Sequence, residues 1–344
     1  MVTEGERDTQ VRSTRRTVIT RIVVLVITGV SLYIVAPSLI ATFGDIPKLA
    51  SVFPLWFVPI FVLESLAFVS IWELMRIALR TDRWFDVACA QLTGNSLSRA
   101  LPGGAATGGA AQFEMLTRAG FDGTTTTTAL TAVGLLSTAT LFTLPLLVLP
   151  SMVFGLAVDS KLAHGAIVAG VLAVFLLSGA SVLLLSDSVV RTGGKFVDWC
   201  FVRIRHRTPE PPYATRLVDA RDTVRASLSE SWKRAVPAAF GNQLFDYGAL
   251  YTSLWAVGAH VDPLLVLLAF VAASALAMIP LTPGGLGFVE GGLIGVLTLA
   301  GVSPEHAVIG TLLYRLFSYW LPLPAGAIAS YLFGRYHRRE ARSS

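Results

Sequence analysis

Two stretches of the chain, PGGAATGGAAQFEMLTRAG at residues 102–120 and PGGLGFVEGGLIGVLTLAG at residues 283–301, follow one pattern. Both begin with Pro-Gly-Gly and end with Leu-Thr-X-Ala-Gly, where X is any residue, so the offset is constant at 181 residues, from 102 to 283. Proline lacks the amide that continues a helix, and glycine costs conformational entropy within one, so each copy predicts a turn between two helices. The pattern predicts two related halves, unless two glycine-rich loops match by chance.

Long apolar blocks surround both copies. Of the 344 residues, 53% are hydrophobic and 14% charged, against about 25% charged residues in an ordinary soluble domain. The apolar blocks lie at residues 22–43, 52–79, 125–149, 162–185, 236–257, 264–279, 285–300 and 308–333. A helix needs about 20 apolar residues to cross a bilayer, so the composition excludes a soluble enzyme and predicts an all-α polytopic membrane protein with about 6 to 8 transmembrane helices.

The segment around the first Pro-Gly-Gly is too polar for two lipid-facing spans. Gln91, Asn95 and Arg99 precede the turn, and basic residues flank the segment at both ends. Non-helical backbone at membrane depth needs protein or water around it, because lipid cannot satisfy its amide groups. We therefore expect a re-entrant hairpin that enters from the cytoplasm and turns at residues 102–104.

The second copy lies between loops that contain no Lys or Arg, so both of its ends are expected outside. Its arms, 264–279 and 285–300, have about 16 residues each, which is short for a full span. A hairpin that enters from the outer face would complete an inverted repeat, in which interrupted helices meet at the midplane and form a substrate site. Two full spans leave the termini on the same sides, so this alternative stays open.

The basic residues indicate the orientation. Most of the 27 Lys and Arg residues fall in the N-terminal leader, the loops near 80 and 118, the segment 187–235 and the C-terminal tail. The positive-inside rule then predicts cytoplasmic N- and C-termini for a multi-pass protein of the plasma membrane. The net charge of +5 is attributed to contact with anionic lipid headgroups and gives no support for nucleic-acid binding.

These boundaries predict five regions along the chain. The expected order is a basic cytoplasmic N-terminus (1–20), an N-terminal membrane half (21–186), a cytoplasmic basic linker with an amphipathic helix (187–235), a C-terminal membrane half (236–334) and a basic cytoplasmic tail (335–344).

The C-terminal half carries a longer motif. The run IPLTPGGLGFVE at residues 279–290 is followed by GVSP at 301–304, Leu-Tyr-Arg at 313–315 and WLP at 320–322. This series resembles the C-terminal signature of the lysylphosphatidylglycerol synthase transmembrane family, and the resemblance extends over residues 20–335, with a looser fit in the N-terminal half. It implies a flippase-like transporter that moves a phospholipid or lipid-linked headgroup between leaflets. Its expected substrate is an anionic phospholipid or a polyprenyl-type lipid.

Ionisable residues inside the apolar segments indicate where such a site would lie, because each is costly in lipid unless it is paired or hydrated. Arginines suit a lipid phosphate, and carboxylates suit a cationic headgroup or a coupling proton. Internal ion pairs of Glu290 with Arg315, and of Arg99 with Asp246 or Glu64, are the structural alternative. The predicted substrate-binding residues, including the two turns, are Glu64, Arg99, Pro102, Gly103, Gly104, Asp246, Pro283, Gly284, Gly285, Glu290, Tyr314 and Arg315.

Other functions have less support. The family's synthetases carry a soluble aminoacyl-transfer domain, and this chain ends shortly after its last apolar block, so we expect a stand-alone member that does not aminoacylate lipid. No GxxxxGK[ST], CxxC or HExxH motif occurs, so no enzyme activity, cofactor or metal is expected. The alternative to transport is a non-transporting membrane subunit that presents lipid to a lipid-modifying enzyme, with its basic segment 187–235 as the docking surface. A homodimer is a further possible assembly.

Overall fold

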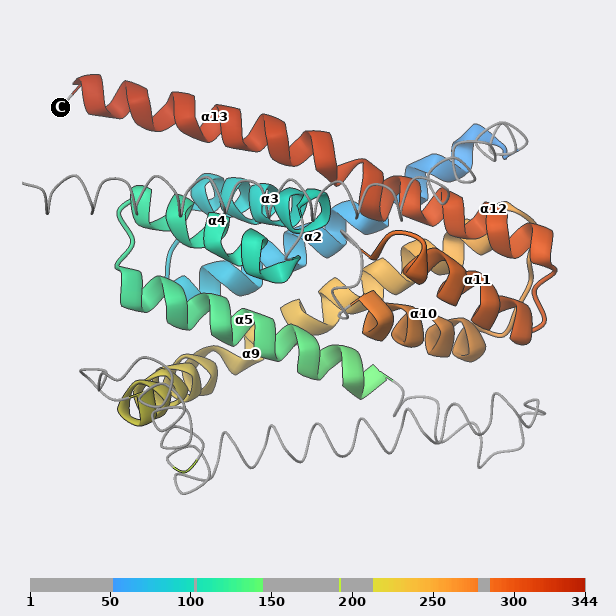
Figure 1. The fold of residues 1–344 in the computed structure, drawn as a ribbon, viewed down its shortest axis with the longest axis horizontal. Coiled ribbons are helices and arrows are strands. Elements are labelled where there is room, and N and C mark those ends of the chain that lie inside the picture. Colours follow the sequence, from blue (N-terminus) through green and yellow to red (C-terminus); the bar gives the residue numbers. More distant parts are fainter. Residues whose placement is uncertain (1–51, 102–103, 145–191, 193–212, 278–284, 344) are drawn as a thin grey trace, which may run out of the picture.

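The computed structural model describes residues 52–101, 104–144, 192, 213–277 and 285–343 (Figure 1). The predicted spans at 22–43 and 162–185 lie outside the described residues, as do Pro102, Gly103, Pro283 and Gly284. Every element in the described part of the chain is helical, which confirms the all-α class.

The helices follow one another with short connections. They are η1 (Pro54–Trp56), α2 (Phe57–Leu79), α3 (Trp84–Ala100), α4 (Ala105–Arg118), α5 (Gly123–Thr143), α9 (Tyr213–Ala256), α10 (Pro263–Ala277), α11 (Phe288–Leu299), α12 (Pro304–Arg315), the π-helical turn η4 (Leu316–Trp320) and α13 (Pro322–Ser343). Among the described residues, two helical segments are long and apolar enough to cross a membrane, Pro54–Leu79 and Pro304–Arg339.

Local signals set several helix ends. The α2 helix ends at Arg80, which takes a left-handed conformation with φ of 51°. The α5 helix begins after Asp122, whose side chain accepts a hydrogen bond from the Thr125 amide at 2.9 Å. That amide favours the ionised carboxylate and lowers the pKa of Asp122. At α12, Ser303 caps the helix and Pro304 occupies its first turn.

The α9 helix crosses the boundary that the sequence places between linker and membrane half. It is continuous from Tyr213 to Ala256, 44 residues, with Pro237 inside it. The predicted amphipathic segment is therefore the first part of a helix that continues into the bundle. At the junction, Trp232 is exposed and Ala235 is buried.

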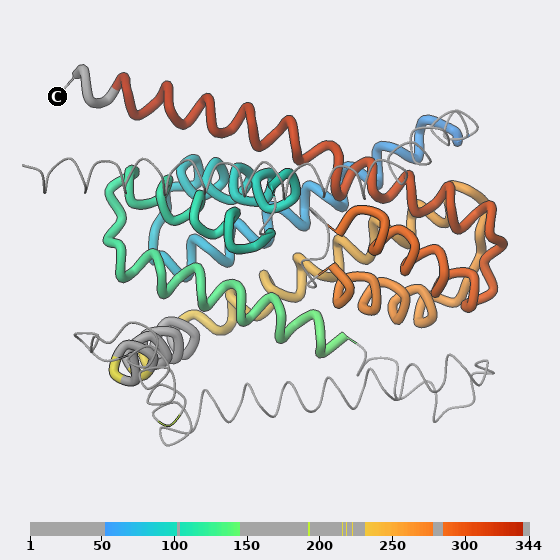
Figure 2. Tube along the Cα trace, in the orientation of Figure 1, coloured from blue at the N-terminus to red at the C-terminus, as the bar shows by residue number. Residues whose placement is uncertain are grey.

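Each Pro-Gly-Gly copy connects two short helices that pack against each other, α3 with α4 and α10 with α11. In Figures 1 and 2 the two hairpins lie toward opposite ends of the molecule, and the turn of each is directed toward its middle. The arms contain 17, 14, 15 and 12 residues. At about 1.5 Å per residue the longest of them measures roughly 25 Å, less than a hydrocarbon core of about 30 Å.

The first hairpin also packs against the C-terminal helix. Thr93, Ser96 and Arg99, three residues apart on one face of α3, each donate a hydrogen bond to a backbone carbonyl of the η4–α13 segment. This approach requires Gly326, because a Cβ atom there would lie 2.4 Å from the Cβ atom of Ser96 and 2.5 Å from the carbonyl oxygen of Leu92. The C-terminal half of the chain thereby fixes the turn end of the N-terminal hairpin.

Candidate functional site

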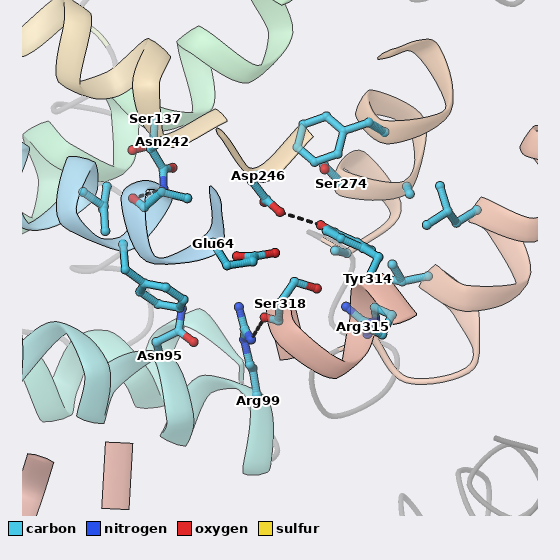
Figure 3. Close-up of a pocket in the computed structure, with 18 of the residues that line it drawn as sticks. Glu64, Asn95, Arg99, Ser137, Asn242, Asp246, Ser274, Tyr314, Arg315 and Ser318 are labelled. Atoms are coloured by element: carbon cyan, nitrogen blue, oxygen red, sulfur yellow. Dashed lines mark hydrogen bonds between the residues drawn. The ribbon is translucent and has the colours of Figure 1, made fainter. Parts of the chain in front are cut away.

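A cavity of about 340 Å³ lies where the two hairpins meet (Figure 3). The last turns of α3 reach it through Asn95 and Arg99, and the end of α10 reaches it through Ser274. The first residues of α11 also line it, through Val289 and Leu293. Both halves of the repeat therefore contribute to one site.

The cavity wall is unusually polar for a segment surrounded by apolar helices. Its polar lining residues are Glu64, Gln91, Asn95, Arg99, Ser137, Asn242, Asp246, Ser274, Tyr314, Arg315 and Ser318. Buried charges of both signs and neutral hydrogen-bonding groups thus share one space, which suits a ligand that is itself polar and charged.

Arg315 and Glu290 form an ion pair beside the cavity. The Nε atom of Arg315 donates to Oε1 of Glu290 at 2.6 Å, and both side chains are about nine-tenths buried. The second oxygen of Glu290 accepts from the Gly287 amide at 2.7 Å, at the N-terminus of α11. Gly287 and Gly285 have φ of 83° and 72°, values that favour glycine, so the glycine-rich sequence produces this helix start. The ion-pair alternative is therefore correct for Glu290 and Arg315.

Arg99 is held differently. Its guanidinium donates to the carbonyl oxygen of Ser318, and the Tyr319 hydroxyl donates to the carbonyl oxygen of Arg99 at 3.1 Å. Within the part of the chain that the structure describes, no carboxylate lies within 4 Å of the Arg99 guanidinium. The alternative ion pair of Arg99 with Asp246 or Glu64 is thus wrong for this structure. Arg99 is a positioned cation at the cavity wall.

The acidic side of the cavity comes from α2 and α9. The Tyr314 hydroxyl donates to Oδ1 of Asp246 at 2.7 Å. Glu64 is 5% exposed, and in Figure 3 its carboxyl group is drawn between Asp246 and Arg99. Asn242, one helical turn before Asp246, donates to the carbonyl oxygen of Ala67 at 3.0 Å and joins α9 to α2.

Several buried polar atoms at the cavity have no hydrogen-bond partner among the described residues. They are Oε1 of Glu64, Oδ1 of Asn95, Oγ of Ser137 and Oγ of Ser318. A buried polar group without a partner costs free energy, and such groups are usually satisfied by water or a ligand. Their concentration around one cavity indicates a site built to receive polar atoms.

The structure brings most of the predicted site residues together. Glu64, Arg99, Asp246, Tyr314 and Arg315 line the cavity, and Glu290 contacts Arg315. Gly104 and Gly285 lie in the turns and do not line it. No group of three His, Cys, Asp or Glu residues that could hold a metal occurs in the described ranges.

The sequence prediction missed Gln91, Asn95 and Asn242 as lining residues. Gln91, Asn95 and Arg99 are four residues apart along α3, and Asn242 precedes Asp246 by four residues on α9. Residues at that spacing share one helix face, so the polar face around each charged residue was the available signal.

Comparison with known proteins adds independent information. The family described as "Lysylphosphatidylglycerol synthase TM region" matches residues 18–326. A UPF0104 membrane protein of Methanothermobacter thermautotrophicus is 29% identical over 191 residues, which cover 53% of this chain and 56% of that protein. One of Methanocaldococcus jannaschii is 41% identical over 73 residues, which cover 21% of this chain and 31% of the relative. The chain thus spans about half the length of the first of these relatives or less. The protein is a membrane protein and belongs to the lysylphosphatidylglycerol synthase TM region family.

Proposed function

We propose that this protein moves the phosphate-bearing headgroup of an anionic phospholipid or a polyprenyl-type lipid between the two leaflets, through the cavity between the hairpins. The observation that carries this proposal is Arg99. It is a cation at the wall of a polar cavity, held by backbone carbonyls and with no carboxylate at salt-bridge distance among the described residues. The family membership supports a lipid-related role.

The two arginines would act in sequence on the phosphate. A guanidinium offers donors in a planar fork that matches two phosphate oxygens. Arg99 is available as the first contact because its printed partners are neutral carbonyls. Arg315 is held by Glu290 and stacks over the Tyr319 ring at 4.5 Å, so it becomes a second contact when the phosphate competes with that carboxylate.

The neutral groups of the cavity would bind the rest of the headgroup. Asn95, Ser137 and Ser318 carry buried oxygens without partners among the described residues, and they lie beside the charged residues. Hydroxyl groups of a glycerol or sugar headgroup would satisfy these atoms. The lipid tails would remain in the bilayer, because the cavity volume of about 340 Å³ suits a headgroup and not acyl chains.

The proposed topology gives the headgroup access from either side. In this proposal the chain crosses the membrane several times with both termini in the cytoplasm, and the two hairpins enter from opposite faces and meet at the cavity. The short arms of the hairpins and the absence of Lys and Arg around the second one support this arrangement.

Transport is favoured over catalysis by the residues at the cavity. Among its described lining residues there are serines and carboxylates but no histidine or cysteine, and Asp246 is bonded to Tyr314. A nucleophile with a base in hydrogen-bond reach is the usual signature of covalent catalysis, and these residues do not form one. We therefore propose a transporter that performs no covalent chemistry.

Reconstitution tests the proposal. The full-length protein is placed in phosphatidylcholine vesicles with a trace of phosphatidylglycerol labelled with a nitrobenzoxadiazole on one acyl chain. Dithionite, which stays outside, then reduces the accessible label. We expect the signal to fall well below the fraction that empty vesicles protect, and heat-denatured protein to behave as empty vesicles do. Protection equal to that of empty vesicles would instead favour the non-transporting subunit that presents lipid to a partner enzyme.

A further inference from the structure

Glu64 and Asp246 are two acidic residues that anion binding at Arg99 does not explain. Glu64 on α2 and Asp246 on α9 face each other at the cavity, and their carboxyl groups are in hydrogen-bonding contact (Figure 3). Oε1 of Glu64 has no partner among the described residues, whereas Oδ1 of Asp246 accepts from the Tyr314 hydroxyl at 2.7 Å. The pair is therefore buried and only partly neutralised by hydrogen bonds.

A contact between two carboxyl groups has a chemical requirement. Two ionised carboxylates repel each other and have no hydrogen to share, so a hydrogen bond between them needs a proton on one of them. In such a pair the proton belongs to both groups. The Glu64–Asp246 pair thus has the geometry of a site that holds one shared proton.

The charged groups that face the pair come from α3 and α12. Arg99 projects from α3, and Tyr314 and Arg315 project from α12. Arg315 is already bound by Glu290 of α11. The described residues that α5 and α10 add to the cavity are serines, alanines and Phe270, none of which carries a charge.

The charges of the described cavity balance when one proton is shared. The carboxyl pair then carries one negative charge, Arg99 carries one positive charge, and Glu290 and Arg315 cancel. A phosphate monoester or diester anion bound at Arg99 adds one negative charge to a buried site, which is costly at membrane depth. A second proton removes that cost, because it forms an O–H bond at the remaining carboxylate and leaves both carboxyl groups neutral.

We infer that the Glu64–Asp246 pair is a proton-binding site that couples lipid movement to protons, one proton entering with each anionic headgroup and leaving with it on the other side. The inference rests on the proposed transport function of the same cavity and adds its coupling ion. The proton is taken from water on the entry side and returned to water on the exit side, so no other reactant is needed.

A pH gradient tests the coupling in the reconstituted full-length protein. Vesicles contain the same labelled phosphatidylglycerol and a gradient of one pH unit, and potassium with valinomycin holds the membrane potential at zero. One proton per lipid supports an enrichment of up to about tenfold in the leaflet that faces the alkaline side, since one pH unit corresponds to a tenfold ratio. We expect this enrichment for the unmodified protein and for Glu114→Gln, an exposed control on α4.

The variants Glu64→Gln and Asp246→Asn should abolish the enrichment. A variant that no longer transports is examined in weakly buffered detergent, where binding of dihexanoyl-phosphatidylglycerol to the unmodified protein should take up about one proton per lipid. Uptake by either variant equal to that of the unmodified protein would overturn the assignment of the pair.

The remaining outcomes separate the two proposals. An even distribution of transported lipid at every gradient overturns the coupling and leaves transport standing. Enrichment that follows a sodium gradient at equal pH overturns the proton as the coupling ion. No transfer of lipid at all overturns the proposed function, and the coupling with it.

Discussion

Arg315 and Glu290 connect two helices that follow the second Pro-Gly-Gly. The carboxylate of Glu290 receives Nε of Arg315 at 2.6 Å with one oxygen and the Gly287 amide at 2.7 Å with the other. One side chain therefore caps the N-terminus of α11 and orients the cation of α12. This double use is why we expect the pair to affect both stability and transport.

Replacement of Arg315 by lysine separates charge from geometry. Arg315→Lys keeps the positive charge but loses the planar fork and the stacking over Tyr319. We expect lipid transfer in vesicles to fall by about tenfold, the effect of losing one charge-assisted hydrogen bond worth ~1.4 kcal/mol. Transfer at the unmodified rate would show that the guanidinium does not contact the lipid.

Replacement of Glu290 removes the other half of the pair. Glu290→Gln leaves the Arg315 cation without its carboxylate partner, and loss of one member of a buried ion pair costs about 3 kcal/mol. We expect a lower melting temperature in detergent together with slower release of the anionic lipid. In a double-mutant cycle with Arg315→Lys, the two effects should be non-additive. If only stability changes and transport is intact in both single variants, the pair is structural.

The seam between α3 and α13 should be intolerant of a single methyl group. In Gly326→Ala the new Cβ atom would lie 2.5 Å from the carbonyl oxygen of Leu92, so α13 must shift away from α3. We expect a loss of about 1–3 kcal/mol, the range for overpacking. The matched control is Gly134→Ala on α5, where nothing lies within 4 Å of the added atom. This control should be neutral or slightly stabilising, because alanine favours a helix over glycine. Equal melting temperatures of the two variants would contradict a tight seam.

Cysteine labelling tests the proposed entry side of the second hairpin. His260→Cys and Glu305→Cys, both at exposed positions before α10 and at the start of α12, should react with an impermeant maleimide added from outside the cell. Gly284→Cys, in the turn, should react weakly or not at all from the cytoplasmic side. Strong labelling of Gly284→Cys from the cytoplasm alone would restore two full spans. The native Cys89 and Cys200 are first replaced by serine.

The sequence predicted the class of fold because its signals are strong and local. Long apolar blocks indicate membrane helices, and the Pro-Gly-Gly copies mark the ends of α3 and α10 and the starts of α4 and α11 within a few residues. Continuity of α9 through Pro237 was not predicted. A proline removes only one helical hydrogen bond, and packing on both sides of it can maintain the helix.

The site was predictable in its charged residues and not in their partners. Charged residues within apolar segments are rare enough to identify Glu64, Asp246 and Arg315 from the sequence. Which carboxylate pairs with which arginine depends on distances between helices far apart in the chain. Arg99 illustrates this, because its partner is the carbonyl oxygen of Ser318, a backbone atom that no sequence pattern indicates.

The most direct test compares two arginines in the same reconstituted protein. Arg99 lies at the cavity, whereas Arg118 is exposed on α4 and pairs with Glu114 at 2.5 Å. Each is changed to glutamine, the melting temperature of each variant is measured, and the rate of leaflet-to-leaflet transfer of labelled phosphatidylglycerol is recorded. We predict that Arg99→Gln slows transfer by about tenfold or more, while Arg118→Gln transfers at the unmodified rate. Equal rates for both variants at equal stability would contradict a headgroup path through this cavity.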